Sequence, residues 1–208
     1  CHPDQAAALL QLKQSFFIAA TTATLLPSWQ NGTNCCLWEG ISCDAFSGLV
    51  TVLDLNGYGL NSYGLDPALF SLKSLRRLDL SMNSLGEYSY NITTAEFEGL
   101  ALLTHLNHSN SGLDGQMPIG ISKLVNLVSL DLSSHTVPDY DDSTTAADSF
   151  NHLWEPNFVI LVANLNNLRD LYLGGVHIMS SNGEDWGKAL AKYVPHLRVL
   201  SLEGCGLN

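Results

Sequence analysis

The stretch "LRRLDLSMNSL", residues 75–85, carries the pattern that decides the fold of this 208-residue chain. It fits the template L-x-x-L-x-L-x-x-N-x-L at every position. The template recurs, with substitutions, as "VTVLDLNGYGL" (50–60), "LTHLNHSNSGL" (103–113), "LVSLDLSSHTV" (127–137), "LRDLYLGGVHI" (168–178) and "LRVLSLEGCGL" (197–207). Successive starts are 25, 28, 24, 41 and 29 residues apart, so the one long interval indicates an insertion.

Each L-x-L core predicts a short strand with its leucines turned inward and the intervening residues facing solvent. One repeat cannot bury its leucines alone, whereas stacked repeats share a core and pair their strands into a parallel sheet. The predicted fold is therefore an α/β repeat, a leucine-rich-repeat solenoid with a parallel β-sheet on its concave side. We place the solenoid at residues 49–208, with about six repeats and an insertion at 138–160.

The N position of the template turns the chain after each strand, and Asn83 is the standard residue there. Cys205 occupies the same position in the last repeat, which predicts a buried, reduced structural thiol. The alternative, a reactive nucleophile, is disfavoured because no base lies beside it in the sequence. The turn positions are otherwise irregular, being filled by Tyr58, Ser111, His135 and Val176. His108 replaces an inward leucine, and we expect it to weaken its repeat.

Residues 1–48 predict a helical cap over the first repeat. The segment "DQAAALLQLKQSF" (4–16) is expected to form a helix, capped by Asp4, with Leu9, Leu12 and Phe16 on one face. It is followed by "LPSWQNGTNCCLWEGISC" (26–43), which contains three of the five cysteines. Because a solenoid exposes its terminal leucines unless they are covered, this region is expected to seal that end.

The cysteine spacing favours two disulfides in the cap. Adjacent cysteines rarely bond to each other, so Cys35 and Cys36 should have different partners. Cys1 and Cys43 are the nearby candidates, and we favour the pairs Cys1–Cys35 and Cys36–Cys43. The sequence alone leaves this connectivity open.

Composition and sequons point to an exported protein. The sequons begin at Asn31, Asn91 and Asn107, and together with the cysteines they favour glycosylation in an oxidising, extracellular setting. The apolar run "FVILVANL" (158–165) is far too short for a membrane span. A net charge of −11 disfavours nucleic acids and anionic membrane surfaces as partners.

The chain offers no convincing catalytic or metal-binding motif, so we expect no enzyme activity, no cofactor and no metal. His105 and His108 should face opposite sides of a strand. The acidic run "DYDDSTTAAD" (139–148) lacks the glycine and terminal glutamate of a calcium loop. The polar residues that follow one another across the sheet lie on an open surface rather than in a walled cleft; they are Asp54, Asp79, Asn107 and Asp131.

The outward positions of the predicted strands are better suited to binding. They include Arg76, Arg77, His105, Arg169, Asp170, Tyr172, Arg198 and Glu203. Arginine and tyrosine are frequent interface residues, and Arg169, Tyr172 and Arg198 form the richest predicted cluster, with Arg76 and Arg77 as further candidates. An ordinary solvated face is an equally weighted alternative. A glycan on Asn107 would direct a ligand toward the later strands.

The sequence also resembles a known family. The cap and the stretch "GLDGQMPIGISKLVNL" (112–127) resemble plant extracellular leucine-rich-repeat proteins. The later stretches "WEPNFVILVANLNNLRDLYLGGVHI" (154–178) and "NGEDWGKALAKYVPHLRVLSLEGCGL" (182–207) are similar to receptor-like proteins of the wilt-resistance kind. These are cell-surface immune receptors with a long repeat ectodomain, one membrane span and no kinase.

The resemblance implies a module that recognises ligands in the apoplast or at the outer face of the plasma membrane. Its expected partners are a protein or peptide ligand and a co-receptor ectodomain. No C-terminal cysteine cap is predicted, so we expect either a part of a longer parent chain, whose membrane anchor would lie downstream, or a truncated gene product. The alternative is a secreted leucine-rich-repeat inhibitor of microbial cell-wall-degrading hydrolases, which would carry a cysteine cap after a few further repeats.

Overall fold

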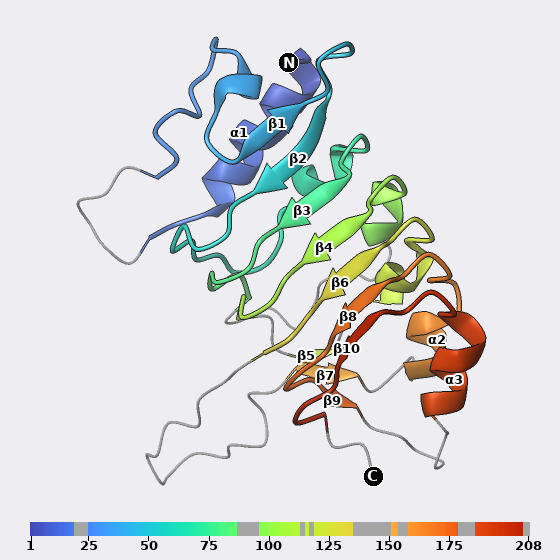
Figure 1. Cartoon of the computed structure of the whole chain (residues 1–208). Coiled ribbons are helices and arrows are strands. Elements are labelled where there is room, and N and C mark those ends of the chain that lie inside the picture. Colours follow the sequence, from blue (N-terminus) through green and yellow to red (C-terminus); the bar gives the residue numbers. More distant parts are fainter. Residues whose placement is uncertain are drawn as a thin grey trace, which may run out of the picture.

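The repeats stack side by side along one axis, as the computed structural model in Figure 1 shows from the blue N-terminal to the red C-terminal strands. The structure describes residues 1–18, 25–86, 96–112, 115–116, 119–134, 151–153, 158–178 and 186–205. Predictions that fall outside these ranges, such as those for Asn91, His135 and the acidic run 139–148, are not addressed by it.

The main sheet has seven strands in the order β1-β2-β3-β4-β6-β8-β10. Its first two strands are antiparallel and the later neighbours are parallel, as expected for stacked repeats. The strands are β1 Ile41–Cys43, β2 Val50–Asp54, β3 Arg77–Asp79, β4 His105–Asn107, β6 Ser129–Asp131, β8 Asp170–Tyr172 and β10 Val199–Ser201.

The core is the row of inward leucines that the repeat predicted. Leu53, Leu78, Leu106, Leu130 and Leu171 lie in register across the sheet, and each is at most 1% exposed. The corresponding Leu200 of β10 is 40% exposed. The structure therefore confirms the predicted leucine-rich-repeat fold, a solenoid with a parallel sheet.

In two repeats the turn after the strand is held by the side chain at the N position. Asn83 is buried, and its Nδ2 donates to the main-chain oxygens of Leu55 (2.8 Å), Leu80 and Ser81 (both 3.0 Å). Cys205 Sγ donates in the same way to Leu173 O at 2.9 Å, and the thiol is free and buried. Burial raises the pKa of this thiol, which keeps it protonated. Cys205 thus replaces the asparagine as a structural donor.

Short helical segments cover the face of the solenoid opposite the main sheet (Figure 1). They are the 3-10 turns η2 Pro67–Ser71, η3 Glu96–Leu100 and η4 Ile119–Lys123, and the α-helices α2 Phe158–Val162 and α3 Trp186–Tyr193. Neighbouring segments contact one another, and Phe70 packs edge-on against Phe97 with ring centroids 5.1 Å apart. A further 3-10 turn, η1 Cys35–Leu37, belongs to the cap.

Helix α1 Pro3–Ser15 covers the first repeat and buries Leu9 and Leu12, while Phe16 is buried just beyond its end. The expectation that Asp4 caps this helix was wrong. The N-cap is His2, which makes no side-chain capping bond, and Asp4 lies within the first turn. The helix begins earlier because Pro3 has a backbone angle suited to the first helical position and needs no donor there.

A second sheet of three parallel strands was not predicted. It consists of β5 Gly115–Gln116, β7 Asn151–Leu153 and β9 His177–Ile178. Strand β7 and the first part of α2 lie within residues 138–160, the span predicted as an insertion. These two-to-three-residue strands have no leucine alternation of their own, so their pairing depends on the stacking of whole repeats.

His108 is an irregularity in the core. It is 2% exposed at a position where other repeats carry leucine, whereas His105 is exposed on the opposite side of the strand. Ser111 Oγ donates to His108 O (2.6 Å) and also contacts His108 Nδ1, so Nδ1–H is the donor in that second contact. The other ring nitrogen, Nε2, has no hydrogen-bond partner. Burial lowers the pKa of His108 to about 4.

We expect His108→Leu to stabilise the fold and to flatten its acid dependence. The folded chain holds His108 neutral down to about pH 4, while the unfolded chain protonates it near its ordinary pKa of 6.5. The unfolded state therefore binds the extra proton, and wild-type stability falls by about 3 kcal/mol as the pH drops through this window. At pH 7 the substitution should add about 1–2 kcal/mol by removing an unpaired buried nitrogen.

Guanidinium unfolding of both chains at pH 7 and pH 4.5 measures this difference. Other titrating groups are common to both chains, so their contributions cancel in the comparison. An unchanged pH dependence in His108→Leu would show that His108 is protonated without cost in the folded state.

Candidate functional site

The outward residues at the beginning of the strands form a continuous row across the repeats. We call it the strand-start row; its members are Thr51, Arg76, Thr104, Val128, Arg169 and Arg198. Each member after Thr51 donates its main-chain N–H to the carbonyl of the preceding member, at distances of 2.7–2.8 Å. The row is therefore held in register by the backbone, although the residues are up to 41 positions apart in the sequence between neighbouring members.

This edge of the sheet carries every arginine of the chain. Arg76, Arg169 and Arg198 belong to the strand-start row, and Arg77 follows at the first position of β3. All four are exposed. Within the described ranges, none of the four guanidinium groups forms a side-chain hydrogen bond or ion pair. In a chain with a net charge of −11, this is a concentrated positive surface with free donors.

Only two residues of the predicted cluster of Arg169, Tyr172 and Arg198 lie next to each other in the structure. Arg169 and Arg198 are direct neighbours, with Arg198 N donating to Arg169 O at 2.7 Å. Tyr172 lies at the other end of β8, in register with Asp131 and Ser201, and is half-buried. Tyr172 lies three residues further along the chain than Arg169, a distance of about 10 Å in an extended strand.

Arg76 and Arg169 instead share a surface depression of about 350 Å³. Its remaining lining residues come from the turns and strand starts of the repeats between them; they are Leu102, Thr104, Asn126, Val128 and Asn167. Asn126 Nδ2 donates to Ala101 O at 2.8 Å and Asn167 Nδ2 to Val125 O at 3.0 Å, which holds both amides in place. Sequence reasoning missed this depression, although its asparagines occupy the same repeat position, directly before the first leucine.

A second row on the same face consists of Asp54, Asp79, Asn107 and Asp131, which are in register as predicted. The Oδ1 of each accepts the main-chain N–H two residues later, at distances of 3.2, 3.1, 3.1 and 3.0 Å respectively. In three cases the serine hydroxyl of that later residue donates to the same oxygen. These side chains therefore fix the turn that follows each strand.

The predicted glycan sites have different surroundings. Asn31 is exposed in the cap, and Asn91 lies outside the described residues. Asn107 Nδ2, the atom that a glycan would modify, donates to Asp79 Oδ2 at 3.1 Å. Glycosylation of all three asparagines stays a prediction.

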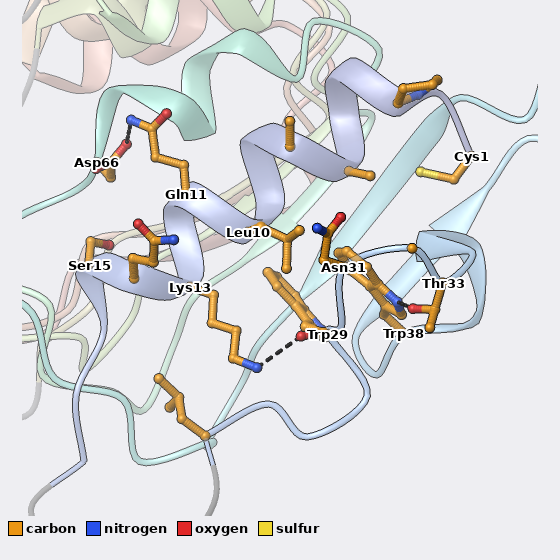
Figure 2. A pocket seen from close by; sticks show the side chains of 16 residues that line it. Cys1, Leu10, Gln11, Lys13, Ser15, Trp29, Asn31, Thr33, Trp38 and Asp66 are labelled. Carbon is orange, nitrogen blue, oxygen red and sulfur yellow. Dashed lines mark hydrogen bonds between the residues drawn. The ribbon is translucent and has the colours of Figure 1, made fainter.

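The cap contains the two disulfides expected from the sequence, Cys1–Cys35 and Cys36–Cys43. Trp29 and Trp38 are stacked with ring centroids 5.5 Å apart and are at most 3% exposed. Figure 2 shows the hollow between α1 and this region. Lys13 Nζ donates there to the carbonyls of Leu26 and Trp29, both at 2.9 Å.

Several polar groups of this hollow hold the cap together or fix it to the first repeat. Gln11 Nε2 donates to Asp66 Oδ1 at 3.1 Å, and Trp38 Nε1 donates to Thr33 Oγ1 at 2.7 Å. Among the described residues, the cluster with metal-ligand spacing is Cys1, Cys35 and Cys36, whose sulfurs are committed to the disulfides. The geometry makes the cap a structural element and leaves the arginine-bearing edge as the candidate site.

The disulfide-bonded cap and the stacked repeats together define a capped leucine-rich-repeat solenoid with an exposed strand face. The family Leucine rich repeat N-terminal domain matches residues 2–44, which is the cap. Receptor-like protein 6 of Arabidopsis thaliana is 36% identical over 224 residues, covering 100% of this chain and 21% of that protein. Receptor-like protein 7 of the same species is 39% identical, covering 89% of the chain and 18% of that protein.

Solved structures agree with this assignment. The BIR2 ectodomain of Arabidopsis thaliana is 25% identical, with a TM-score of 0.65 over 86% of this chain and 84% of that one. The BIR3–SERK2 complex provides a second match, with 24% identity and a TM-score of 0.66 over 96% of this chain and 97% of that one.

The chain is similar over its whole length to a segment of plant receptor-like proteins, and its cap matches the leucine-rich-repeat N-terminal family. It spans about a fifth of the length of the curated relatives it matches. None of its helices within the described ranges is long and apolar enough to cross a membrane.

Proposed function

We propose that this chain is the ligand-recognition module of a plant immune receptor-like protein and that it binds a protein or peptide ligand on the solenoid surface. The observation that carries the proposal is the placement of all four arginines along one edge of the sheet, exposed and without a side-chain hydrogen bond or ion pair to any residue that the structure describes. Arginine is among the residues that contribute most to protein interfaces, and guanidinium groups without internal partners are free to bind a ligand.

A co-receptor ectodomain is the second proposed partner. The relatives are receptor-like proteins, and one solved structure with the same fold is a complex of BIR3 with SERK2. Partner binding of this kind needs a surface beyond the ligand site, and the solenoid offers its edges and its helical face for that purpose (Figure 1).

We propose binding rather than catalysis. The acidic side chains on the strand face are the groups that would act as acids or bases, and Asp54, Asp79 and Asp131 each accept a hydrogen bond from the turn that follows their strand. Glycoside hydrolysis, for example, needs two carboxyl groups that face each other across a substrate. Carboxylates that stabilise turns on an open sheet do not provide that arrangement.

The test is binding of selected peptides to variants of the strand face. Peptides should first be selected from a random 16-residue display library on the immobilised chain, and their affinities measured by calorimetry. We expect Tyr172→Ala or Arg198→Ala to lower affinity about thirtyfold, equivalent to about 2 kcal/mol, because both remove large interface side chains. Asp54→Ala should lower the affinity by less than about threefold, since this carboxylate accepts a hydrogen bond within the turn that follows its own strand.

Thermal melting of each variant controls for folding. If Asp54→Ala alone weakens binding, recognition belongs to the acidic row, and the hydrolase-inhibitor alternative becomes the better account. Peptides whose affinity is unchanged by all three substitutions would place the binding surface away from Tyr172, Arg198 and Asp54.

A further inference from the structure

We propose that the depression between Arg76 and Arg169 binds an extended acidic peptide segment that carries two carboxylates about four residues apart. This inference rests on the proposed function and adds the chemical class and spacing of the ligand. It comes from the structure alone, because Arg76 and Arg169 lie in repeats separated by the long interval and meet in one depression only after stacking.

The charges of the depression select an anion. Arg76 and Arg169 are exposed at its two ends, and its other lining residues are neutral. No carboxylate belongs to the lining, so nothing inside the depression neutralises the two guanidinium groups. An arginine presents a planar fork of donors that matches the two oxygens of a carboxylate, so each end is suited to one acidic side chain.

The distance between the two ends sets the spacing of the acidic residues. From β3 to β8 the sheet passes through β4 and β6, which is three strand-to-strand steps. At about 4.8 Å per step this places the two positions roughly 14 Å apart. A peptide extended across the strands advances about 3.3 Å per residue, so residues i and i+4 match this separation.

The middle of the depression is suited to a side chain without charge. Leu102 is 47% exposed and Val128 is half-buried, and both contribute apolar surface between the arginines. Thr104 Oγ1 donates to Arg76 O at 2.8 Å, and the amides of Asn126 and Asn167 donate to main-chain carbonyls. Since these polar groups already have partners, the floor is preorganised, and an apolar residue at i+2 of the ligand fits it.

The experiment uses synthetic 13-residue peptides of glycine and serine with one central leucine and two glutamates. Versions place the glutamates two, four or eight positions apart, and a control replaces both by glutamine. Fluorescence anisotropy with the whole chain measures their affinities. We expect the four-position peptide to bind at least about tenfold more tightly than the glutamine control and the two-position peptide, because two positions cannot span both arginines. It should bind about threefold more tightly than the eight-position peptide, whose longer flexible linker lowers the effective concentration of the second glutamate.

Protein variants identify the arginines responsible. Arg76→Gln and Arg169→Gln should each weaken the four-position peptide about tenfold, as expected for loss of a charge-assisted contact. Arg77→Gln is the matched control, because it removes the same charge from the adjacent residue, which does not line the depression. It should change affinity by less than about threefold.

Four results would overturn the inference. Equal losses in all three arginine variants would indicate general electrostatic attraction, and equal binding of all glutamate spacings would exclude two fixed contacts. Polygalacturonate that binds as tightly as the four-position peptide would assign the depression to an acidic polysaccharide. If display-selected peptides depend on Tyr172 and Arg198 but not on Arg76 and Arg169, the proposed function stands and this inference alone fails.

Discussion

Gly175→Ala is expected to lower the free energy of unfolding by about 4 kcal/mol, which combines backbone strain with a collision. Gly175 has φ +75°, a conformation in which a side chain is strained. A Cβ built there would lie 1.8 Å from Ser134 O, a backbone atom of the preceding repeat. Ser134 O cannot move without displacing the turn of its own repeat. The two repeats must therefore separate locally to make room for the added Cβ.

Gly57→Ala is the matched control. Gly57 occupies the same position in its repeat, two residues after the inward Leu55, and has φ +67° with nothing within 4 Å of a built Cβ. The substitution Gly57→Ala introduces only the strain of a positive φ, so it should lower the free energy of unfolding by about 1 kcal/mol. Met82 and Asn110, at the same repeat position, already tolerate φ of 56° and 47°. Equal destabilisation in the two variants, measured by guanidinium unfolding, would refute the contact with Ser134.

Removing the Cys1–Cys35 disulfide by Cys1→Ala with Cys35→Ala should cost about 4 kcal/mol on the loop-entropy estimate. The two cysteines are 34 residues apart, and Cys35 is fully buried in the core that the cap shares with the first repeat. Without this link the unfolded cap regains the freedom of a long loop. The first leucines of the solenoid then depend on noncovalent packing against α1 alone.

The second disulfide provides the comparison. Cys36 and Cys43 are only seven residues apart, so Cys36→Ala with Cys43→Ala should cost about 2.5 kcal/mol on the same estimate. Denaturant unfolding of the two double variants measures both losses. Equal losses would mean that local packing, rather than loop closure, determines what each disulfide contributes.

The solenoid could be predicted because its information is local and repeated. The leucine spacing specifies which side chains point inward, and Leu53, Leu78 and Leu106 are buried in register as this spacing requires. The template also predicted the role of Cys205, which now donates to Leu173 O as Asn83 donates to Leu55 O. Both cases depend on a position within the repeat and on no contact particular to this chain.

What could not be predicted depends on contacts between distant residues. The strands β5, β7 and β9 pair only because whole repeats stack. Arg76 and Arg169 line one depression because only two strands, β4 and β6, lie between β3 and β8 in the sheet. The residues next to either arginine in the sequence do not specify this strand order. Tyr172 was grouped with Arg169 because both were assigned outward positions, and that assignment did not specify that they lie at different ends of the strand.

The most direct measurement is a crystal structure of the chain with a display-selected peptide bound. We predict that the peptide crosses the starts of the strands. Its side chains should lie within hydrogen-bond distance of at least two of the four arginines, Arg76, Arg77, Arg169 and Arg198. A peptide bound in the hollow beside α1, or on the face covered by α2 and α3, with the four guanidinium groups left in solvent, would contradict it.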